Sequence, residues 1–209
     1  MKPHLSAKLI EHIEGNITPR YELFDKAHDR KHVFTVMSQS LRLAQHYDVD
    51  TEMVYTIAAY HDLGLEAGRE HHHTESARIV REDVRLREFF TAEQINIIAD
   101  AVEDHRASNS HAPRTIYGKI VAEADRIIER HTIMQRTIQY GLARYPSLGE
   151  SEQIERAIEH IKEKYGRGGY LKLWIPESTN ATNLEEFRKL IDNEEELKRE
   201  LTVIFHKEK

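Results

Sequence analysis

The sequence predicts an all-α fold, and three features of the chain lead to this prediction. Glycine and proline, which interrupt helices, account for only 9 and 5 of the 209 residues. Apolar side chains recur at helical spacing along most of the chain. The alternating pattern of a half-buried strand is almost absent. Because no repeat or low-complexity tract divides the chain, its length fits a single helical domain over residues 1–209.

The first half of the chain contains four predicted helices. Residues 1–15 are amphipathic and lack the apolar stretch of a signal peptide. Residues 53–63 are apolar nearly all round, which predicts a buried helix that ends at Gly64. Between them, apolar residues at helical spacing define one helix face, namely Val33, Val36, Met37, Leu41 and Ala44. A fourth helix is marked by Ala77, Val80 and Val84.

The second half continues the helical pattern. Residues Thr91 to Gln94 resemble a capping box, which begins a helix with apolar residues at positions 95, 98 and 102. A helix after Pro113 is marked by Ile120, Val121, Ala124 and Ile128. The remaining helices are expected over residues 154–165, 183–192 and 194–207.

One segment breaks the helical pattern. Residues 168–179, GGYLKLWIPEST, are rich in large apolar side chains and contain a proline. We expect an extended arm there, with at most a short strand or helix. The arm either packs on the core or serves as a dimer contact or a lid over a substrate.

Composition limits the classes of function. The net charge of -6 comes from 30 basic and 36 acidic residues, so a broad nucleic-acid-binding surface is not expected. The absence of cysteine excludes disulfides and thiolate zinc sites and is compatible with a reducing compartment. No segment reaches the ~18 consecutive apolar residues of a membrane span, and we therefore expect a cytoplasmic protein. Histidine is abundant, with 14 residues, so its positions along the chain are informative.

Several ionisable residues lie on predicted apolar helix faces. His32 shares a face with apolar residues, and His61 and Asp62 close the most apolar helix. His105 and Asp125 continue the apolar faces of two later helices. A single inward residue of this kind is usually a satisfied core residue or a helix cap. Together they would be costly to bury unless a divalent cation bound them, and nitrogen and oxygen ligands suit Mn, Fe, Co, Ni, Zn or Mg.

The order of these residues resembles the HD-domain superfamily of metal-dependent phosphohydrolases, in which a single histidine precedes an adjacent His-Asp pair and a late aspartate. The resemblance is carried by AHDRKHVFTVMSQSLRLA, IAAYHDLG and IVAEADRI and covers roughly residues 25–130. In layout, the chain is similar to small stand-alone bacterial members, including hydrolases of dinucleoside polyphosphates. The resemblance implies an HD-domain-like helical bundle as catalytic core. Residues from about 140 to 209 are then a C-terminal helical extension that matches no catalytic motif.

The resemblance also implies a metal site. One ion is expected, which would provide a metal-bound hydroxide for attack on a phosphate group. Its implied ligands are His32, His61, Asp62 and Asp125.

Two further segments, HHHTESARIV and VEDHRAS, resemble those that bind a second ion in two-metal members of the superfamily. They select His72 and His105 as additional ligands, with Asp62 as the bridge between the two ions. In one-metal members the equivalent positions face the substrate phosphate. Either neighbour of His72, His71 or His73, could replace it, and the histidine triplet could instead be a solvated loop.

The remaining roles concern proton transfer and substrate binding. His105 and Glu66 are candidates for the acid that protonates the leaving group, beside the catalytic Asp62. The side chains that could bind substrate phosphate are Arg69, Arg106 and Lys119. For each of these cations, a surface salt bridge is the competing interpretation.

The function expected from these observations is hydrolysis of a nucleotide or another small phosphate ester. The sequence HDLGL lacks the lysine and the GYP triplet of the cyclic-dinucleotide branch. In place of the Glu-Asp pair of the alarmone branch there is only Glu66, one position further on. A di-iron oxygenase on the same scaffold would require all six ligands. A non-catalytic metal- or nucleotide-binding module is the third hypothesis. The expected partners are a small phosphorylated substrate and, through residues 168–179, a second copy of the chain in a homodimer.

Overall fold

The computed structural model describes residues 5–24 and 28–209. The structure is 72% helical, and no strand occurs in the described residues, which confirms the all-α prediction. None of the helices in these residues is both long enough and apolar enough to cross a membrane. The α-helices are α1 (Ala7–His12), α2 (Arg30–Ala44), α3 (Thr51–Tyr60), α4 (His72–Glu82), α5 (Ala92–Asp104), α6 (Ile116–Asp125), α7 (Arg130–Arg144), α8 (Glu150–Tyr165), α9 (Asn180–Asp192) and α10 (Glu194–Glu208). The shorter elements are a π-helix, Ile13–Ile17, and the 3-10 helices Thr18–Leu23, Leu63–Ala67 and Val84–Glu88.

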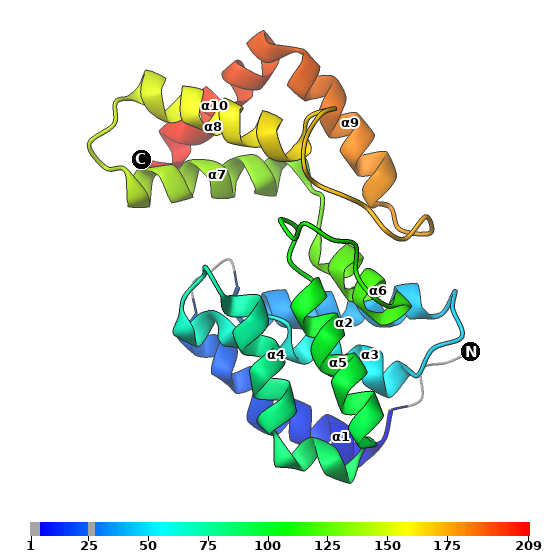
Figure 1. Ribbon diagram of the computed structural model, residues 1–209. Helices are drawn as coiled ribbons and strands as arrows, with labels where there is room; N and C mark the ends of the chain where they lie inside the picture. Colours follow the sequence, from blue (N-terminus) through cyan, green and yellow to red (C-terminus); the bar gives the residue numbers. More distant parts are fainter. Residues whose placement is uncertain (1–4, 25–27) are drawn as a thin grey trace. The chain divides into compact units, whose positions relative to one another are not determined.

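The chain forms two compact units (Figure 1). Unit 1 contains the chain up to Arg126 together with Trp174–Ser178. Unit 2 contains Ile127–Leu173 and Thr179–Lys209, and therefore helices α7 to α10. A single domain over 1–209, with a core over about 25–130 and an extension over about 140–209, stays a prediction.

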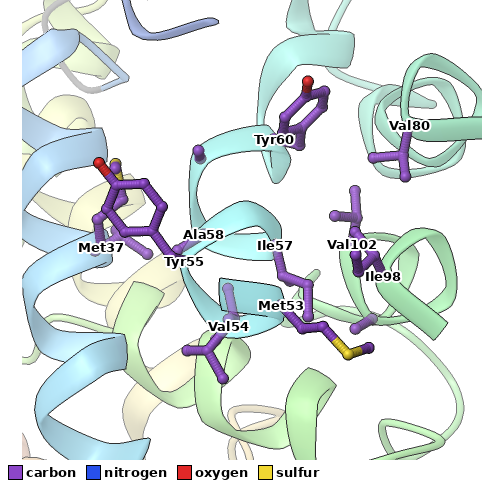
Figure 2. Packing of buried hydrophobic residues seen from close by; sticks show 14 of the residues in the cluster. Met37, Met53, Val54, Tyr55, Ile57, Ala58, Tyr60, Val80, Ile98 and Val102 are labelled. Atoms are coloured by element: carbon purple, nitrogen blue, oxygen red, sulfur yellow. The ribbon is translucent and has the colours of Figure 1, made fainter. Parts of the chain in front are cut away.

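Helix α3 forms the centre of unit 1. Every side chain from Met53 to Tyr60 is buried, as expected for a helix that is apolar on all sides. In Figure 2, Ile57 points toward Ile98 of α5, whereas Tyr55 lies on the side of Met37 of α2. Because neighbouring helices cover both sides of α3, the two residues that follow it, His61 and Asp62, are also buried.

The predicted role of Gly64 is wrong. Helix α3 ends at Tyr60, and Gly64 lies within the following 3-10 helix rather than at a left-handed helix end. In the described residues, the glycine with a positive φ is Gly68, at 104°. A Cβ atom on Gly64 would lie 2.1 Å from the carbonyl oxygen of His72 and 2.6 Å from the amide nitrogen of Ser76. Glycine is therefore required here by the close approach of the backbone of α4.

Two apolar residues lie outside the helices to which the sequence pattern assigned them. Val84 is 65% exposed, because α4 ends at Glu82 and the Asp83 side chain accepts a hydrogen bond from the amide of Arg85, starting a new turn. Ile128 is buried but follows the end of α6 at Asp125. In both cases a local turn ends the helix where apolar spacing alone would extend it.

The predicted extended arm contains a strap, Trp174–Ser178, that belongs to unit 1. The buried carboxylate of Glu123 in α6 accepts hydrogen bonds from the amides of Trp174 at 2.7 Å and Ile175 at 3.4 Å, and from the Ser178 hydroxyl. Ile175 is 2% exposed, and Trp174 packs against the core. This part of the arm therefore packs on the core, one of the expected alternatives.

We expect Glu123→Gln to destabilise unit 1 by about 1–3 kcal/mol, because an amide cannot accept all the hydrogen bonds that the buried carboxylate accepts. The matched control is Glu177→Gln, since Glu177 is exposed and accepts a hydrogen bond from Tyr47. The control should change the free energy of unfolding by less than about 0.5 kcal/mol. Urea denaturation measures both changes, and equal effects would show that Glu123 does not anchor the strap.

Candidate metal centre

The first residue of the centre is His32, in the first turn of α2. The helix begins there because the Asp29 side chain accepts a hydrogen bond from the His32 amide at 2.9 Å, which is an N-cap interaction. Val33 and Val36 of the same helix are buried in the core. Together, the cap and this packing place the buried ring of His32 at the inner end of the helix.

The His-Asp pair lies where the chain leaves α3. His61 is the C-terminal cap residue of the helix, and Asp62 follows with φ −108° and ψ 4°, outside the helical region. The Tyr21 hydroxyl donates a hydrogen bond to the carbonyl of Ala59 at 2.9 Å and accepts one from the Asp62 amide at 3.3 Å. Tyr21 is not among the site residues predicted from the sequence, and nothing in its local pattern marks it.

Three histidines share the same orientation. The Nδ1 atoms of His61, His72 and His105 lie 2.8, 2.8 and 2.6 Å from the carbonyl oxygens of residues three positions earlier. Because a carbonyl only accepts, each Nδ1 carries the proton, and a neutral ring then presents the lone pair of Nε2. This is the arrangement in which a backbone hydrogen bond orients a metal-binding imidazole.

The structure decides among the three adjacent histidines. His72 begins α4 and directs Nε2 to within 3.2 Å of Nε2 of His105. His71 is exposed and lies near Glu70, and His73 lies 3.4 Å from a guanidinium nitrogen of Arg106. Of the triplet, therefore, His72 faces the other predicted ligands.

Asp62 lies between two groups of side chains. Its Oδ2 atom is 3.2 Å from Nε2 of His61 and 3.9 Å from Nε2 of His32. Its Oδ1 atom is 3.4 Å from Nε2 of His105 and 3.5 Å from Nε2 of His72. The donor atoms of each group lie within 4.8 Å of one another, which allows each group to hold one ion. Asp62 is the residue that both groups share.

Asp125, the last residue of α6, completes the first group. Its Oδ1 atom is 3.2 Å from Nε2 of His32 and 3.7 Å from Nε2 of His61. Its side chain is 27% exposed, and that of His72 is 14% exposed, whereas those of His32, His61, Asp62 and His105 are at most 6% exposed. Solvent therefore reaches the cluster mainly at Asp125 and His72.

The hydrogen bonding of this cluster fits bound cations. Both ring nitrogens of His32 and Nε2 of His61 are buried without a hydrogen bond of ordinary geometry. His72 and His105 place two Nε2 atoms 3.2 Å apart, and two lone pairs repel at that distance unless a proton or cation lies between them. Imidazole and carboxylate ligands without sulfur suit first-row transition metals. The donor set thus fits a divalent metal.

Electrostatic coupling changes the protonation of the cluster in the absence of metal. Burial lowers the pKa of His61, but the carboxylates of Asp62 and Asp125 outweigh burial and raise it to about 9. Burial would raise the pKa of Asp62, yet His61 and His105 hold it well below its usual range. For His72, burial and then the proximity of His105 lower the pKa to about 4. The metal-free centre therefore holds an imidazolium beside ionised carboxylates.

We expect metal affinity to rise with pH up to about 9, because His61 must lose its proton before it can bind a cation. Near neutral pH, each ion bound to the first group should release a proton. Titration calorimetry in two buffers of different ionisation enthalpy measures this release. Binding without proton release would show that His61 is not a ligand.

The stability of the metal-free protein should follow the same pKa changes. The folded-state pKa of His61 is raised from 6.5, so its contribution is complete below pH 6.5 and is lost as pH rises through about 9. The pKa of His72 is lowered, so the unfolded chain takes up a proton first and stability falls as pH decreases from 6.5 to about 4. Maximum stability is therefore expected near pH 6.5, and saturating metal should remove the alkaline decline.

A family model described as the HD domain matches residues 30–130. Residues 30–130 are therefore an HD domain. The matched residues contain the whole cluster, from His32 in α2 to Asp125 at the end of α6. Helices α2 to α6 lie within the matched residues and form an HD-domain helical bundle, as the sequence predicts. Searches of curated proteins and of solved structures find no match.

Of the two residues predicted to protonate the leaving group, Glu66 lies outside the cluster of six side chains and His105 lies within it. Both carboxylate oxygens of Glu66 bind the Arg20 guanidinium, at 2.9 and 2.8 Å. To protonate a leaving group, Glu66 would have to leave this ion pair. His105, the other predicted acid, directs Nε2 into the cluster.

The three predicted phosphate-binding cations lie in different settings. Arg69 lies in the loop before α4, 3.5 Å from Nδ1 of His28, whose ring is in turn 5.9 Å from that of His32. Arg106 donates a hydrogen bond to the carbonyl of Glu70 in the same loop. Lys119 lies in α6 six residues before Asp125, which places it on a different face of that helix, about 120° away. Arg69 is therefore connected to the predicted ligand His32 through His28.

Proposed function

We propose that the protein is a divalent-metal-dependent phosphohydrolase that acts on a nucleotide or another small phosphate ester. The observation that carries this proposal is the placement of Asp62, whose two carboxylate oxygens face two separate pairs of histidines. The HD domain, generally associated with this activity, supports the same function.

The cluster residues would have the following roles. His32, His61, Asp62 and Asp125 would hold one cation, and His72 and His105, together with Asp62, would hold a second. A bound divalent cation supplies activation of a water molecule near neutral pH and screening of phosphate charge. Burial of His61 and Asp62 limits bulk water at the inner side of the cluster. Substrate would enter where Asp125 and His72 are exposed.

Positive charge next to the cluster favours an anionic substrate. Arg69 lies in the loop before α4, where its carbonyl accepts a hydrogen bond from Nδ1 of His72, and Arg106 binds this loop through the Glu70 carbonyl. A guanidinium suits a phosphate because it can donate two parallel hydrogen bonds. We propose that Arg69 and Arg106 bind substrate phosphate and that His105 protonates the leaving group when the second ion is absent.

A di-iron oxygenase remains the second candidate, because the structure brings together all six side chains that such a site requires. The metal distinguishes the two functions: two redox-active irons favour the oxygenase, whereas Mn, Co, Ni, Zn or Mg favours the phosphohydrolase.

The test combines metal content with turnover. Protein purified without chelator or tag is measured by plasma mass spectrometry, reloaded with each metal, and assayed for phosphate release from a panel of nucleotides and nucleotide polyphosphates. Up to two ions per chain and turnover that disappears with chelator would support the proposal. His105→Gln should remove the second ion, whereas His12→Gln, a buried histidine outside the cluster, should retain both. Failure to bind metal after reloading would refute the proposal.

A further inference from the structure

The N-terminal 3-10 helix, Thr18–Leu23, contacts the turn that carries the His-Asp pair, although 38 to 46 residues separate the contacting side chains in sequence. Tyr21 is fully buried, and its ring lies 6.4 Å from that of His61. A second ring, that of Phe24, lies edge-on to Tyr21 at 5.3 Å. The turn is therefore covered on the side of Tyr21 by a segment that contains none of the predicted metal ligands.

The Tyr21 hydroxyl binds the main chain on both sides of His61. It donates to the Ala59 carbonyl at 2.9 Å and accepts from the Asp62 amide at 3.3 Å. Ala59 belongs to the last turn of α3, whereas Asp62 has left the helical conformation. One hydroxyl thus connects the last turn of the helix to Asp62, the second residue beyond its end.

The position of this hydrogen bond matters because the two carboxylate oxygens of Asp62 face two different histidine pairs. Each oxygen faces a different histidine pair at 3.2 to 3.9 Å. A shift of the Asp62 backbone would move both oxygens together and lengthen contacts in both groups. The hydrogen bond from the Asp62 amide to Tyr21 restrains the backbone of the residue that carries this side chain.

The same segment holds the turn at a third point. Arg20, the residue before Tyr21, binds both carboxylate oxygens of Glu66 at 2.9 and 2.8 Å. Glu66 lies in the 3-10 helix Leu63–Ala67, which directly follows Asp62. Contacts at Ala59, Asp62 and Glu66 therefore bracket the His-Asp pair from one side.

We infer that Tyr21 is a positioning residue whose hydroxyl holds the His61–Asp62 turn in its metal-binding geometry. The inference rests on the proposed metal function. It assigns the N-terminal segment to the site, because interactions behind metal ligands orient them and affect both affinity and coordination geometry.

The test compares Tyr21→Phe with Tyr55→Phe. Both changes remove one hydroxyl from a buried tyrosine and keep the ring, but the Tyr55 hydroxyl donates to Glu14 at 3.0 Å, away from the cluster. Cobalt(II) serves as the probe because its visible absorption reports coordination geometry. Affinity is measured by competition with a chelator, and thermal unfolding of the metal-free proteins monitors stability.

We expect Tyr21→Phe to weaken cobalt binding about 10- to 100-fold and to change the absorption spectrum. Tyr55→Phe should leave the spectrum unchanged and the affinity within about twofold. Equal affinities and spectra in the two variants would overturn the inference. If Tyr21→Phe does not fold, Arg20→Gln, which releases the more exposed contact, replaces it: weaker cobalt binding supports the inference, and unchanged binding overturns it.

Amide hydrogen exchange in the metal-free proteins separates this inference from the proposed function. Tyr21→Phe should accelerate exchange at Asp62 about tenfold relative to Tyr55→Phe, because the amide loses its acceptor. Faster exchange in the variant, combined with a wild-type protein that binds no cobalt, would refute the metal function and leave the restraint by Tyr21 intact. Unchanged exchange at Asp62 would overturn the inference whether or not metal binds.

Discussion

Asp62→Asn should remove tight metal binding and, with it, the proposed phosphohydrolase activity. The side chain keeps its size, but the charge that both histidine pairs face is lost, and one of the two oxygens is replaced by an NH₂ group that cannot bind a cation. Changes behind metal ligands cost about 10- to 100-fold in affinity, and loss of this shared carboxylate should exceed that range. Plasma mass spectrometry and chelator competition measure the loss of metal.

A matched control for this change is Asp104→Asn. Asp104 is 2% exposed and is bound by Arg114 rather than by the histidine cluster. Its substitution should lower thermal stability and leave the metal content unchanged. Full metal content in Asp62→Asn would show that the centre is elsewhere in the protein.

Gly64→Ala should be strongly destabilising, by about 3 kcal/mol or more, because the added methyl group overpacks a rigid backbone contact. The obstructing atoms are the His72 carbonyl at 2.1 Å and the Ser76 amide at 2.6 Å, which cannot rotate away as a side chain could. Relief requires α4 to move, and His72 is the first residue of that helix. We therefore expect lower affinity for the second ion as well as a lower free energy of unfolding.

Gly15→Ala is the control for the chemical change itself. Gly15 lies in the π-helix Ile13–Ile17, and an added methyl group would meet no atom within 4 Å, so alanine should be neutral or stabilising by up to about 1 kcal/mol. Urea denaturation compares the two variants. Equal stability would mean that α4 can move away from residue 64 at little cost in free energy of unfolding.

The sequence alone determined the fold class and the identity of the inward-facing ionisable residues. Helical periodicity defines which face of a helix is buried, so a polar residue on that face can be recognised without knowledge of the neighbouring helices. His32, His61, Asp62, His105 and Asp125 were all found in this way, and the structure brings them together with His72. A capping box at Thr91 was equally visible, because its hydrogen bonds connect residues three positions apart.

Only the tertiary structure decided the interactions between distant segments. Neither Tyr21 nor Glu123 carries a local signal, since their partners lie 38 to 55 residues away in the chain. Gly64 was misread as a helix end because the sequence shows the residue but not the backbone of α4 that crowds it. Spacing could not select His72 over its neighbours, because that choice depends on where α4 begins relative to α5. Periodicity determines which side of a helix faces inward, whereas the packing of helices determines what each inward side chain meets.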